Sequence, residues 1–553
     1  MAIDGFGNLL IDQTNILTAQ DVEVKLCKIC SNTIPLNNIG QAGNVAITST
    51  GSLAFSNSAI RSDTRGGNPA GNITITSPGI VSFTNSQIVS NTSSTGQAGS
   101  IGIEAGQGIT LVGMEDFSPV LSVETRSAGQ PGSIIINTPS LTLSNTARIT
   151  ATATETATNP LGGGSITLNA STMNLAGVVG VFAETQGQTP AGTLTLQPYE
   201  NQSTLNLTLA PQSLVSASTS GSGRGGNLIV QAPEAITIRG EGQLVVQTTG
   251  IGAAGDLRID TQRLTIADGA TVSASTSSRS PEGTGGNLTI NASESFNLTD
   301  RASLRAQSTG AASAGKVTIN TPNLTATNGT IATSSEQSSG GGINITASNV
   351  RLFGNSDIRS NVASGAGGGG NIDIKADSIL AFDDSDILAF ARDGRGGNIT
   401  LDTRIFFGES YRSAPSNTNP DTLDRNNRVD INATGNLASG TIALPNTTSI
   451  QNSLNELPEN RIDTDSLLAS SCIVRRDRST RGSFTVTGTG GLQERPGDVQ
   501  MSDFPTVDVE TLPSDATSSN RSWQKGDPIV EPQGVYRLPN GKLIMSRECS
   551  HIQ

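Results

Sequence analysis

The sequence predicts an all-β fold: a right-handed single-chain parallel β-helix of about 14 coils, three short strands per coil, with an irregular C-terminal tail. Two observations predict it. A glycine, one variable residue and an apolar pair at i and i+2 recur about every 30 residues as far as residue 401. Each copy is followed by two further short apolar stretches between turn-forming residues, as one coil of a β-helix requires.

The apolar pair is present in every copy of the repeat. The copies begin at Gly7, Gly43, Gly71, Gly99, Gly132, Gly164, Gly192, Gly226, Gly255, Gly286, Gly315, Gly341, Gly370 and Gly397. Two apolar side chains at i and i+2 lie on one face of a strand, which predicts a continuous apolar core. With strands stacked at about 4.8 Å, these coils predict a rod of about 65 Å.

The repeat glycines are expected at the corners of the coils, where glycine and asparagine allow positive φ. The clearest of these corner glycines are Gly43, Gly71, Gly99, Gly226, Gly286, Gly370 and Gly397. The residue after the glycine is often asparagine, as at Asn44, Asn72, Asn371 and Asn398. Neighbouring asparagines predict short amide ladders between coils.

The copy at Gly286 shows the expected strands, at 287–290, 295–298 and 303–308. A leucine-rich repeat does not fit, because its Leu/Asn consensus is absent. A calcium-binding nonapeptide roll does not fit either, because this repeat is too long and too poor in aspartate.

The chain is predicted to change character after the repeats. The predicted parts are the β-helix repeats over 1–403, closing coils with a loop insertion over 404–450, a tail segment with a strand at 483–488 over 451–493, an extended linker over 494–532, and a terminal hairpin over 533–553. The hairpin prediction rests on the Asn540-Gly541 turn between two apolar stretches.

Composition limits the possible functions. The formal net charge of −13 disfavours nucleic acid as a partner, because phosphate binding needs basic patches. The sequence has no run of 18 apolar residues, so we expect no membrane span. The single histidine, His551, lies near the end of the chain, so we expect no Ser/His/Asp catalytic arrangement.

Several motifs resemble catalytic or binding signatures but have simpler explanations. Residues 221–226 match GxGxxG and residues 310–316 nearly match a P-loop, yet a repeat strand follows each where a nucleotide fold needs a helix. Both are expected to be turns of the coil. Cys27 and Cys30 lie in the longest interval between repeats, and we expect an inserted loop or a local disulfide there. We therefore predict no cofactor-binding or metal-binding residues.

The best acidic group is Asp383, Asp384 and Asp386, with Arg392, Asp393 and Arg395 in the following coil. Parallel β-helices include polysaccharide lyases and hydrolases, which need clustered acids on one face. Asp384 and Asp386 share a face and Asp383 does not. We expect a solvated corner, and no catalytic residues are predicted.

The repeats and the tail together resemble a known family. The repeats are built on Gly-Gly-Asn-Ile-Thr-Ile, and the tail contains residues 457–460, Cys472, residues 484–492 and Pro496. They are similar to the filamentous haemagglutinin-like exoproteins of two-partner secretion, especially the large cyanobacterial type. The resemblance covers nearly the whole chain.

The resemblance implies a β-helical rod exported through an outer-membrane pore-forming transporter and displayed or released as an adhesin. Such a rod binds glycans or cell surfaces without catalysis or cofactor. A carbohydrate-active β-helix enzyme is the alternative. Cys472 and Cys549 are candidates for a disulfide that closes the tail in an oxidising compartment, and in some adhesins of this type such a bond retains the rod at its pore.

This sequence departs from the family at its start. Family members begin with a signal peptide and an N-terminal secretion domain, and neither is visible before Gly7, where a repeat already begins. We therefore expect the C-terminal portion of a longer polypeptide or a reading frame with a misplaced start. Export of the chain as it stands is not expected, although the family is secreted or displayed at the cell surface.

Overall fold

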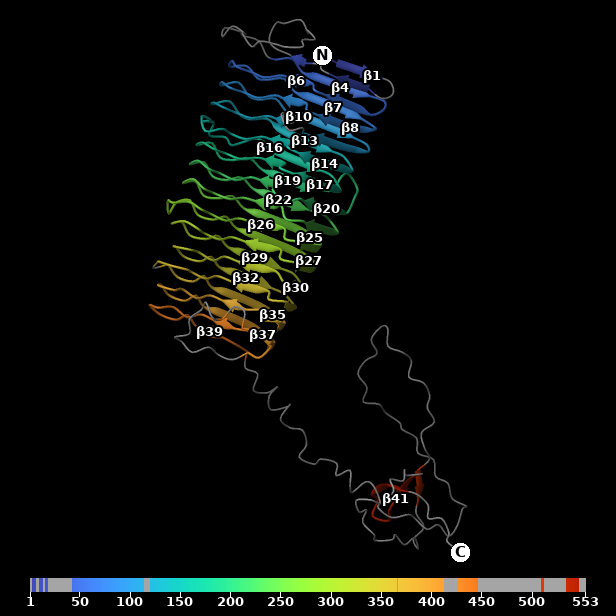
Figure 1. Cartoon of the computed structure of the whole chain (residues 1–553), viewed down its shortest axis with the longest axis vertical. Helices are drawn as coiled ribbons and strands as arrows, with labels where there is room; N and C mark the ends of the chain where they lie inside the picture. Colours follow the sequence, from blue (N-terminus) through green and yellow to red (C-terminus); the bar gives the residue numbers. More distant parts are fainter. Residues whose placement is uncertain are drawn as a thin grey trace. The chain divides into compact units, whose positions relative to one another are not determined.

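The computed structural model describes residues 2–5, 9–12, 15–17, 42–113, 120–365, 367–411, 423, 426–445, 509–511 and 534–546. The chain divides into two units, Met1–Thr447 and Thr448–Gln553. The first unit is a parallel β-solenoid whose turns stack along the chain (Figure 1). No described residue is helical.

The first stack of strands begins each turn and contains the apolar pairs of the copies from Gly43 onward. The prediction that a repeat begins at Gly7 is wrong, because Leu9 pairs with Leu53 and the strand of Leu9 and Ile11 therefore belongs to the second stack. The first stack comprises β1 (Ala2–Gly5), β4 (Val45–Ser49), β7 (Ile73–Ser77), β10 (Ile101–Ala105), β13 (Ser133–Asn137), β16 (Ser165–Asn169), β19 (Leu194–Gln197), β22 (Leu228–Gln231), β29 (Val317–Asn320), β32 (Ile343–Thr346) and β39 (Ile442–Ala443). Burial alternates along these strands, as in β4 and β7, so the pair faces inward and the residues between face outward.

The second stack follows after a corner. It comprises β2 (Leu9–Asp12), β5 (Leu53–Ser56), β8 (Ile80–Thr84), β11 (Gly108–Val112), β14 (Ser140–Asn145), β17 (Thr172–Gly177), β20 (Thr204–Leu209), β23 (Ala235–Arg239), β30 (Asn323–Thr327) and β33 (Asn349–Phe353). In four turns one longer strand passes through both stacks: β25 (Leu257–Ala267), β27 (Leu288–Thr299), β35 (Ile372–Ala381) and β37 (Ile399–Gly408).

The third stack is a separate sheet of 14 strands. It comprises β3 (Asn15–Leu17), β6 (Ala59–Arg61), β9 (Gln87–Val89), β12 (Val120–Ser122), β15 (Arg148–Thr150), β18 (Gly180–Phe182), β21 (Leu214–Ser216), β24 (Gln243–Val245), β26 (Thr271–Ser273), β28 (Ser303–Arg305), β31 (Thr330–Ala332), β34 (Asp357–Arg359), β36 (Ile387–Leu388) and β38 (Ile431–Asn432). A further column of single bridges runs from Thr64 to Gly435.

The core lies inside these stacks as one continuous apolar cluster. Equivalent residues pack on one another in register, as where Ile103 pairs with Ile136. The rings of Phe55 and Phe83 stack with centroids 5.0 Å apart. The predicted all-β parallel β-helix is confirmed. The predicted number of about 14 coils is close to the observed number of turns, since the third stack has 14 strands. Its right-handedness stays a prediction.

The fold requires glycine at the repeat positions for a different reason from the predicted one. Positive φ occurs instead at Asn and Asp residues between the second and third stacks, such as Asn85 and Asp268. A Cβ added at Gly286 would lie 1.7 Å from the carbonyl oxygen of Gly255 in the preceding turn. Glycine is therefore required by the close approach of two backbones and not by φ.

In many turns a threonine or serine side chain holds the segment that precedes the repeat glycine. Thr92 Oγ1 donates to the carbonyl of Gly96 at 2.5 Å, and Thr219 Oγ1 donates to that of Gly223 at 2.7 Å. The GxGxxG match at 221–226 and the P-loop-like stretch at 310–316 lie in such turns, and the sequence prediction for both is confirmed.

The asparagines after the repeat glycines do stack, but their side chains bond to backbone. Asn72 Oδ1 accepts from the backbone N–H of Ser100 at 2.8 Å, and Asn371 Oδ1 accepts from that of Asn398 at 2.9 Å. Because only the backbone N–H of the next turn is used, an asparagine side chain there can make the same kind of bond to the following turn. The predicted amide-to-amide ladder is wrong at this position, because the side-chain oxygen accepts from a backbone N–H of the next turn.

The second unit contains a three-stranded sheet. The strands β41 (Gly534–Arg537) and β42 (Leu543–Ser546) pair antiparallel around Asn540 and Gly541, as the hairpin prediction requires, and Gly541 has φ +82°. The strand β40 (Val509–Thr511) pairs parallel with β41 and falls within 494–532, the predicted linker.

Candidate functional site

A groove follows the corner between the first and second stacks. Three hollows of about 300, 610 and 560 Å³ lie along it. Adjacent hollows share lining residues: Gln197, Pro198 and Glu200 join the first to the second, and Asp260, Thr261 and Ser293 join the second to the third. We call this continuous feature, from Glu104 to Ser348, the polar groove.

The floor of the polar groove is a column of polar side chains at the ends of the first-stack strands. The column contains Asn137, Asn169, Gln197, Gln231, Asp260, Asn291 and Asn320. Each residue follows an inward-facing apolar residue, so strand alternation points it outward. Because the strands pair in register, these side chains lie directly above one another.

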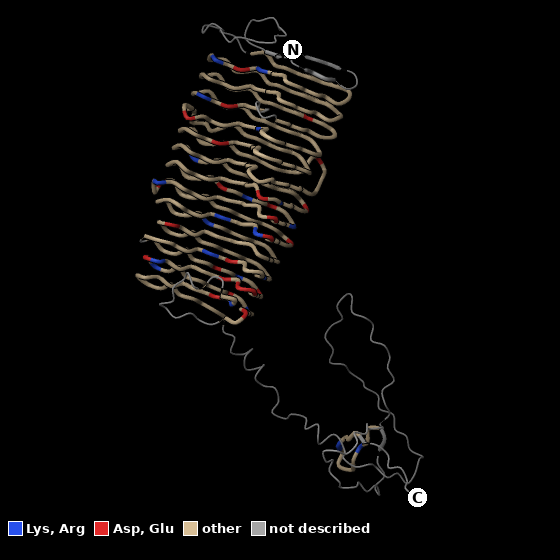
Figure 2. The backbone as a smooth tube through the Cα atoms, viewed as in Figure 1, with Lys and Arg blue, Asp and Glu red and all other residues tan. Residues whose placement is uncertain are grey.

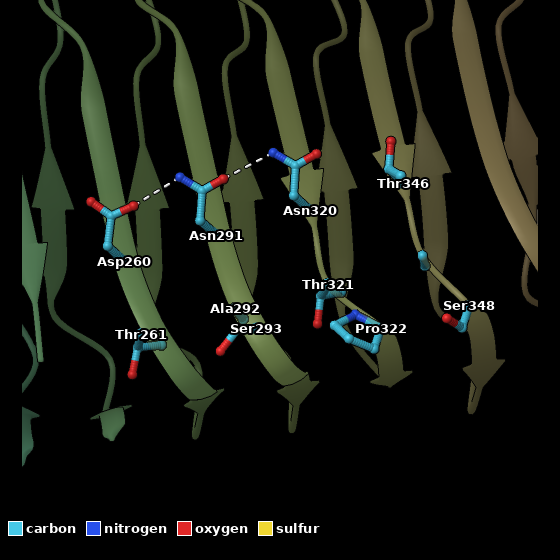
Figure 3. Close-up of a pocket in the computed structure, with 11 residues that line it drawn as sticks. Asp260, Thr261, Asn291, Ala292, Ser293, Asn320, Thr321, Pro322, Thr346 and Ser348 are labelled. Carbon is cyan, nitrogen blue, oxygen red and sulfur yellow. Dashed lines mark hydrogen bonds between the residues drawn. The ribbon is translucent and has the colours of Figure 1, made fainter. Parts of the chain in front are cut away.

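Hydrogen bonds join the column into an amide ladder. Asn169 donates to Asn137, Gln197 Nε2 to Asn169 Oδ1 at 2.6 Å, and Gln231 Nε2 to Gln197 Oε1 at 2.7 Å. Further along, Asn291 Nδ2 donates to Asp260 Oδ1 at 2.8 Å and Asn320 Nδ2 to Asn291 Oδ1 at 2.9 Å (Figure 3). Every bond runs from one turn to the turn before it.

The ladder leaves hydrogen-bonding capacity facing the groove. A side-chain amide has two N–H donors and an oxygen that accepts two bonds, and the ladder uses one donor and one lone pair of a typical member. Donors and acceptors therefore recur at about 4.8 Å, the spacing of the turns. Small side chains and prolines on the second side of the corner, such as Ser293 and Pro322, leave the groove open (Figure 3).

The rim of the groove combines an aromatic ring with paired charges. Tyr199 lines the first hollow, and its hydrogen bond with Glu200 raises the pKa of its hydroxyl. Arg263 bridges Glu234 and Glu294, the latter at 3.0 Å, so one cation joins three turns. Hydrogen bonds from Ser203 and Arg263 lower the pKa of Glu234. Charged residues are otherwise sparse on the described solenoid (Figure 2).

The acidic group that the sequence singled out lies elsewhere. The prediction of a solvated corner holds for the exposed Asp383 and is wrong for Asp384 and Asp386, which are buried. Asp384 is 7% exposed and Asp386 has no exposed surface. Asp386 belongs to a buried column with Asp357 and Asp430 on the third stack. The backbone N–H of Asp386 donates to Asp357 Oδ1 at 3.0 Å, and that of Asp430 donates to Asp386 Oδ1 at 2.8 Å. Asp393 bonds to Gly365 instead and does not join them.

Asp386, the middle member of this column, has a pKa above neutral pH. Burial, and then the neighbouring carboxylates, raise its pKa to about 8, although the hydrogen bond from the backbone of Asp430 opposes the shift. Arg428 pairs with Asp430 at 2.9 Å and Arg359 pairs with Asp357. The outer two acids thus have cations, whereas Asp386 Oδ2 is buried without a hydrogen-bond partner among the described residues.

Two further carboxyl groups were missed in the sequence. Glu124 and Glu184 occupy the same position in turns two apart, after the third stack, within Val123-Glu124-Thr125 and Ala183-Glu184-Thr185. Burial raises the pKa of both, and hydrogen bonds from Thr150 and Ser216 partly oppose it. The recurrence of glutamate directly before the bridging threonine is the sequence feature that could have identified them. Neither glutamate lines the polar groove.

Other predicted residues contribute nothing to the groove. Gly71, Gly99, Gly226, Gly286, Gly370 and Gly397 each approach the carbonyl of the preceding turn, and Gly43 provides such a carbonyl. Cys27, Cys30, Cys472, Cys549 and the segment 483–488 lie outside the described residues. Among the described residues, no group of three or more His, Cys, Asp or Glu is arranged to hold a metal ion.

The fold and the groove define a parallel β-solenoid with a ladder-lined polar groove along one corner. Comparisons with protein-family models, with curated proteins and with solved structures find no match to this chain. The groove is therefore the feature of this protein that indicates its function.

Proposed function

We propose that this protein is a structural rod of the filamentous haemagglutinin-like type whose polar groove binds extended polysaccharide chains. The observation that carries the proposal is the amide ladder, with its regular hydrogen-bonding groups along the stacking direction. A repeating row suits a repeating ligand, because each sugar unit meets an equivalent set of donors and acceptors. The neutral ring of Tyr199 supports the proposal as a face on which a sugar can pack.

The proposed biological setting follows the resemblance of the repeats and tail. In that setting, the rod belongs to a secreted or surface-displayed adhesin exported through an outer-membrane pore-forming transporter. The described part of the structure has no helix long and apolar enough to cross a membrane. The sparse charge on the solenoid supports recognition by hydrogen bonds over recognition by net charge.

Filling the groove is expected to abolish polysaccharide binding. Ser293 is exposed and lines both larger hollows, so Ser293→Trp places an indole in the groove without disturbing the core. Co-sedimentation of the full chain with insoluble polysaccharides measures binding, and we expect at least about a tenfold loss of affinity, near 1.4 kcal/mol.

Ser277→Trp is the matched control, because Ser277 is equally exposed but lies in the turn after the third stack. Equal binding by the wild type and both variants would contradict the groove as the site. The proposal includes no catalytic step, so release of reducing ends or unsaturated sugars from the same polysaccharides would favour the enzyme alternative.

A further inference from the structure

The amide ladder is interrupted at one step, between β22 and β25. Elsewhere each amide N–H donates to the oxygen of the preceding turn. Gln231 Oε1 should receive its bond from residue 260, which pairs with it in register. That residue is Asp260, whose carboxylate has no N–H to donate. Among the described residues, none donates to Gln231 Oε1.

Two acceptors therefore face each other where a donor belongs. Asp260 Oδ1 accepts from Asn291 at 2.8 Å and Asp260 Oδ2 accepts from Arg258 Nε at 2.6 Å, so each oxygen retains a free lone pair. One turn spacing, about 4.8 Å, separates the equivalent backbones. A hydrogen-bond donor placed between Gln231 and Asp260 would satisfy both.

The largest of the three hollows in the polar groove opens at this interruption. Its hollow of about 610 Å³ is lined by Gln231 and Asp260 together with Glu200, Gln202 and Gln262. Four of these five side chains are exposed and the fifth, Asp260, is partly exposed, so a bound molecule can reach them. The nearby cations are already engaged, Arg258 with Asp260 and Arg263 with Glu234 and Glu294. The hollow thus offers acceptors and negative charge.

We propose that this position takes the primary ammonium of an amino sugar within the bound polysaccharide, an unacetylated 2-amino-2-deoxyhexose unit. This inference rests on the proposed function of the groove. An ammonium has three donors and no acceptor, and its charge complements Asp260 and Glu200. A hydroxyl or an acetamide offers a single donor and no charge.

Asp260→Asn tests the proposal, because the new amide supplies the missing donor and removes the negative charge. Calorimetry compares soluble oligomers of glucosamine and of N-acetylglucosamine, with the full chain. We expect the wild type to bind the glucosamine oligomer about tenfold more tightly, and Asp260→Asn to lose this preference while it retains the acetylated ligand.

Two further variants separate the site from general charge. Asp268→Asn makes the same charge change at another corner, where the positive φ of 58° suits asparagine, and it should keep the wild-type preference. Arg258→Gln combined with Asp260→Asn removes both partners of the ion pair and should still lack the preference. Thermal melting of each variant checks that the solenoid is intact.

Three results would overturn the inference. They are equal binding of both oligomers by the wild type, an unchanged preference in Asp260→Asn, and binding of spermidine as tight as that of the glucosamine oligomer. The proposed function has a separate failure: neither oligomer nor any insoluble polysaccharide binds, or Ser293→Trp leaves their binding unchanged.

Discussion

Replacing Gly286 by alanine is expected to destabilise the surrounding turns by about 3 kcal/mol or more. The added Cβ would lie 1.7 Å from the carbonyl oxygen of Gly255 and 2.9 Å from its carbonyl carbon. Both contacts are to backbone, so relief requires two turns to separate. Separation of the turns breaks the backbone hydrogen bonds between β25 and β27 and opens a gap in a close-packed core.

Local hydrogen exchange measures this effect better than global unfolding, because each turn contacts only its neighbours. We expect faster exchange in peptides from the turns on either side of Gly286. Gly102→Ala is the control, because a Cβ there meets no atom within 4 Å. Wild-type exchange in the Gly286 variant, or equal effects of the two variants, would show that close approach is not the reason for the glycine.

The second large expected effect is a loss of stability in the last turns as pH rises from about 4 to about 8. The pKa of Asp386 is raised from 3.8 in the unfolded chain to about 8 in the fold. Between these values the folded state holds a proton that the unfolded state has released, so folding weakens with rising pH. At about 1.4 kcal/mol per pH unit, the loss reaches a few kcal/mol.

The groups that face Asp386 explain both the size and the location of the effect. Asp357 and Asp430 flank it in the column and Asp384 lies nearby, while Arg359 and Arg428 pair with the outer acids. Asp386→Asn keeps a neutral side chain of the same shape at every pH. We therefore expect this variant to be more stable than the wild type at pH 8 and equal to it near pH 4.

Hydrogen exchange of peptides that cover β36 and β38, corrected for the intrinsic pH dependence of exchange, checks this prediction. The double variant Glu124→Gln with Glu184→Gln serves as a comparison. Burial also raises the pKa of these two acids, but their effect on stability is expected in other turns. A pH dependence of β36 that survives Asp386→Asn would contradict the assignment.

The sequence predicted the elements whose pattern is local. The pair Ile73 and Ile75 shows the period of two within five residues, and the hairpin at Asn540-Gly541 shows its turn directly. Features that depend on contacts between adjacent turns were harder to predict from the sequence. Gly286 was assigned to positive φ because glycine commonly serves that purpose, whereas its requirement comes from Gly255, 31 positions earlier in the chain.

The sequence did not predict the polar groove or the burial of the acidic residues, and the reasons are related. Asn291 and Asn320 follow the apolar pairs in the repeat, and aligning the repeats by that position would have revealed the ladder. Aspartate is normally exposed, so Asp386 was expected in solvent. Its burial depends on Asp357 and Asp430 stacking above and below it, which only the register of the turns determines.

Hydrogen exchange with and without a binding polysaccharide shows whether the polysaccharide lies along the polar groove. If the polysaccharide lies in the groove, we expect no change in third-stack strands such as β24 and β26. We expect slower exchange in peptides from the first corner, which cover residues 197–202, 231–234, 260–263 and 291–294. Protection confined to the third stack or to the second unit, with the first corner unchanged, would contradict binding along the polar groove.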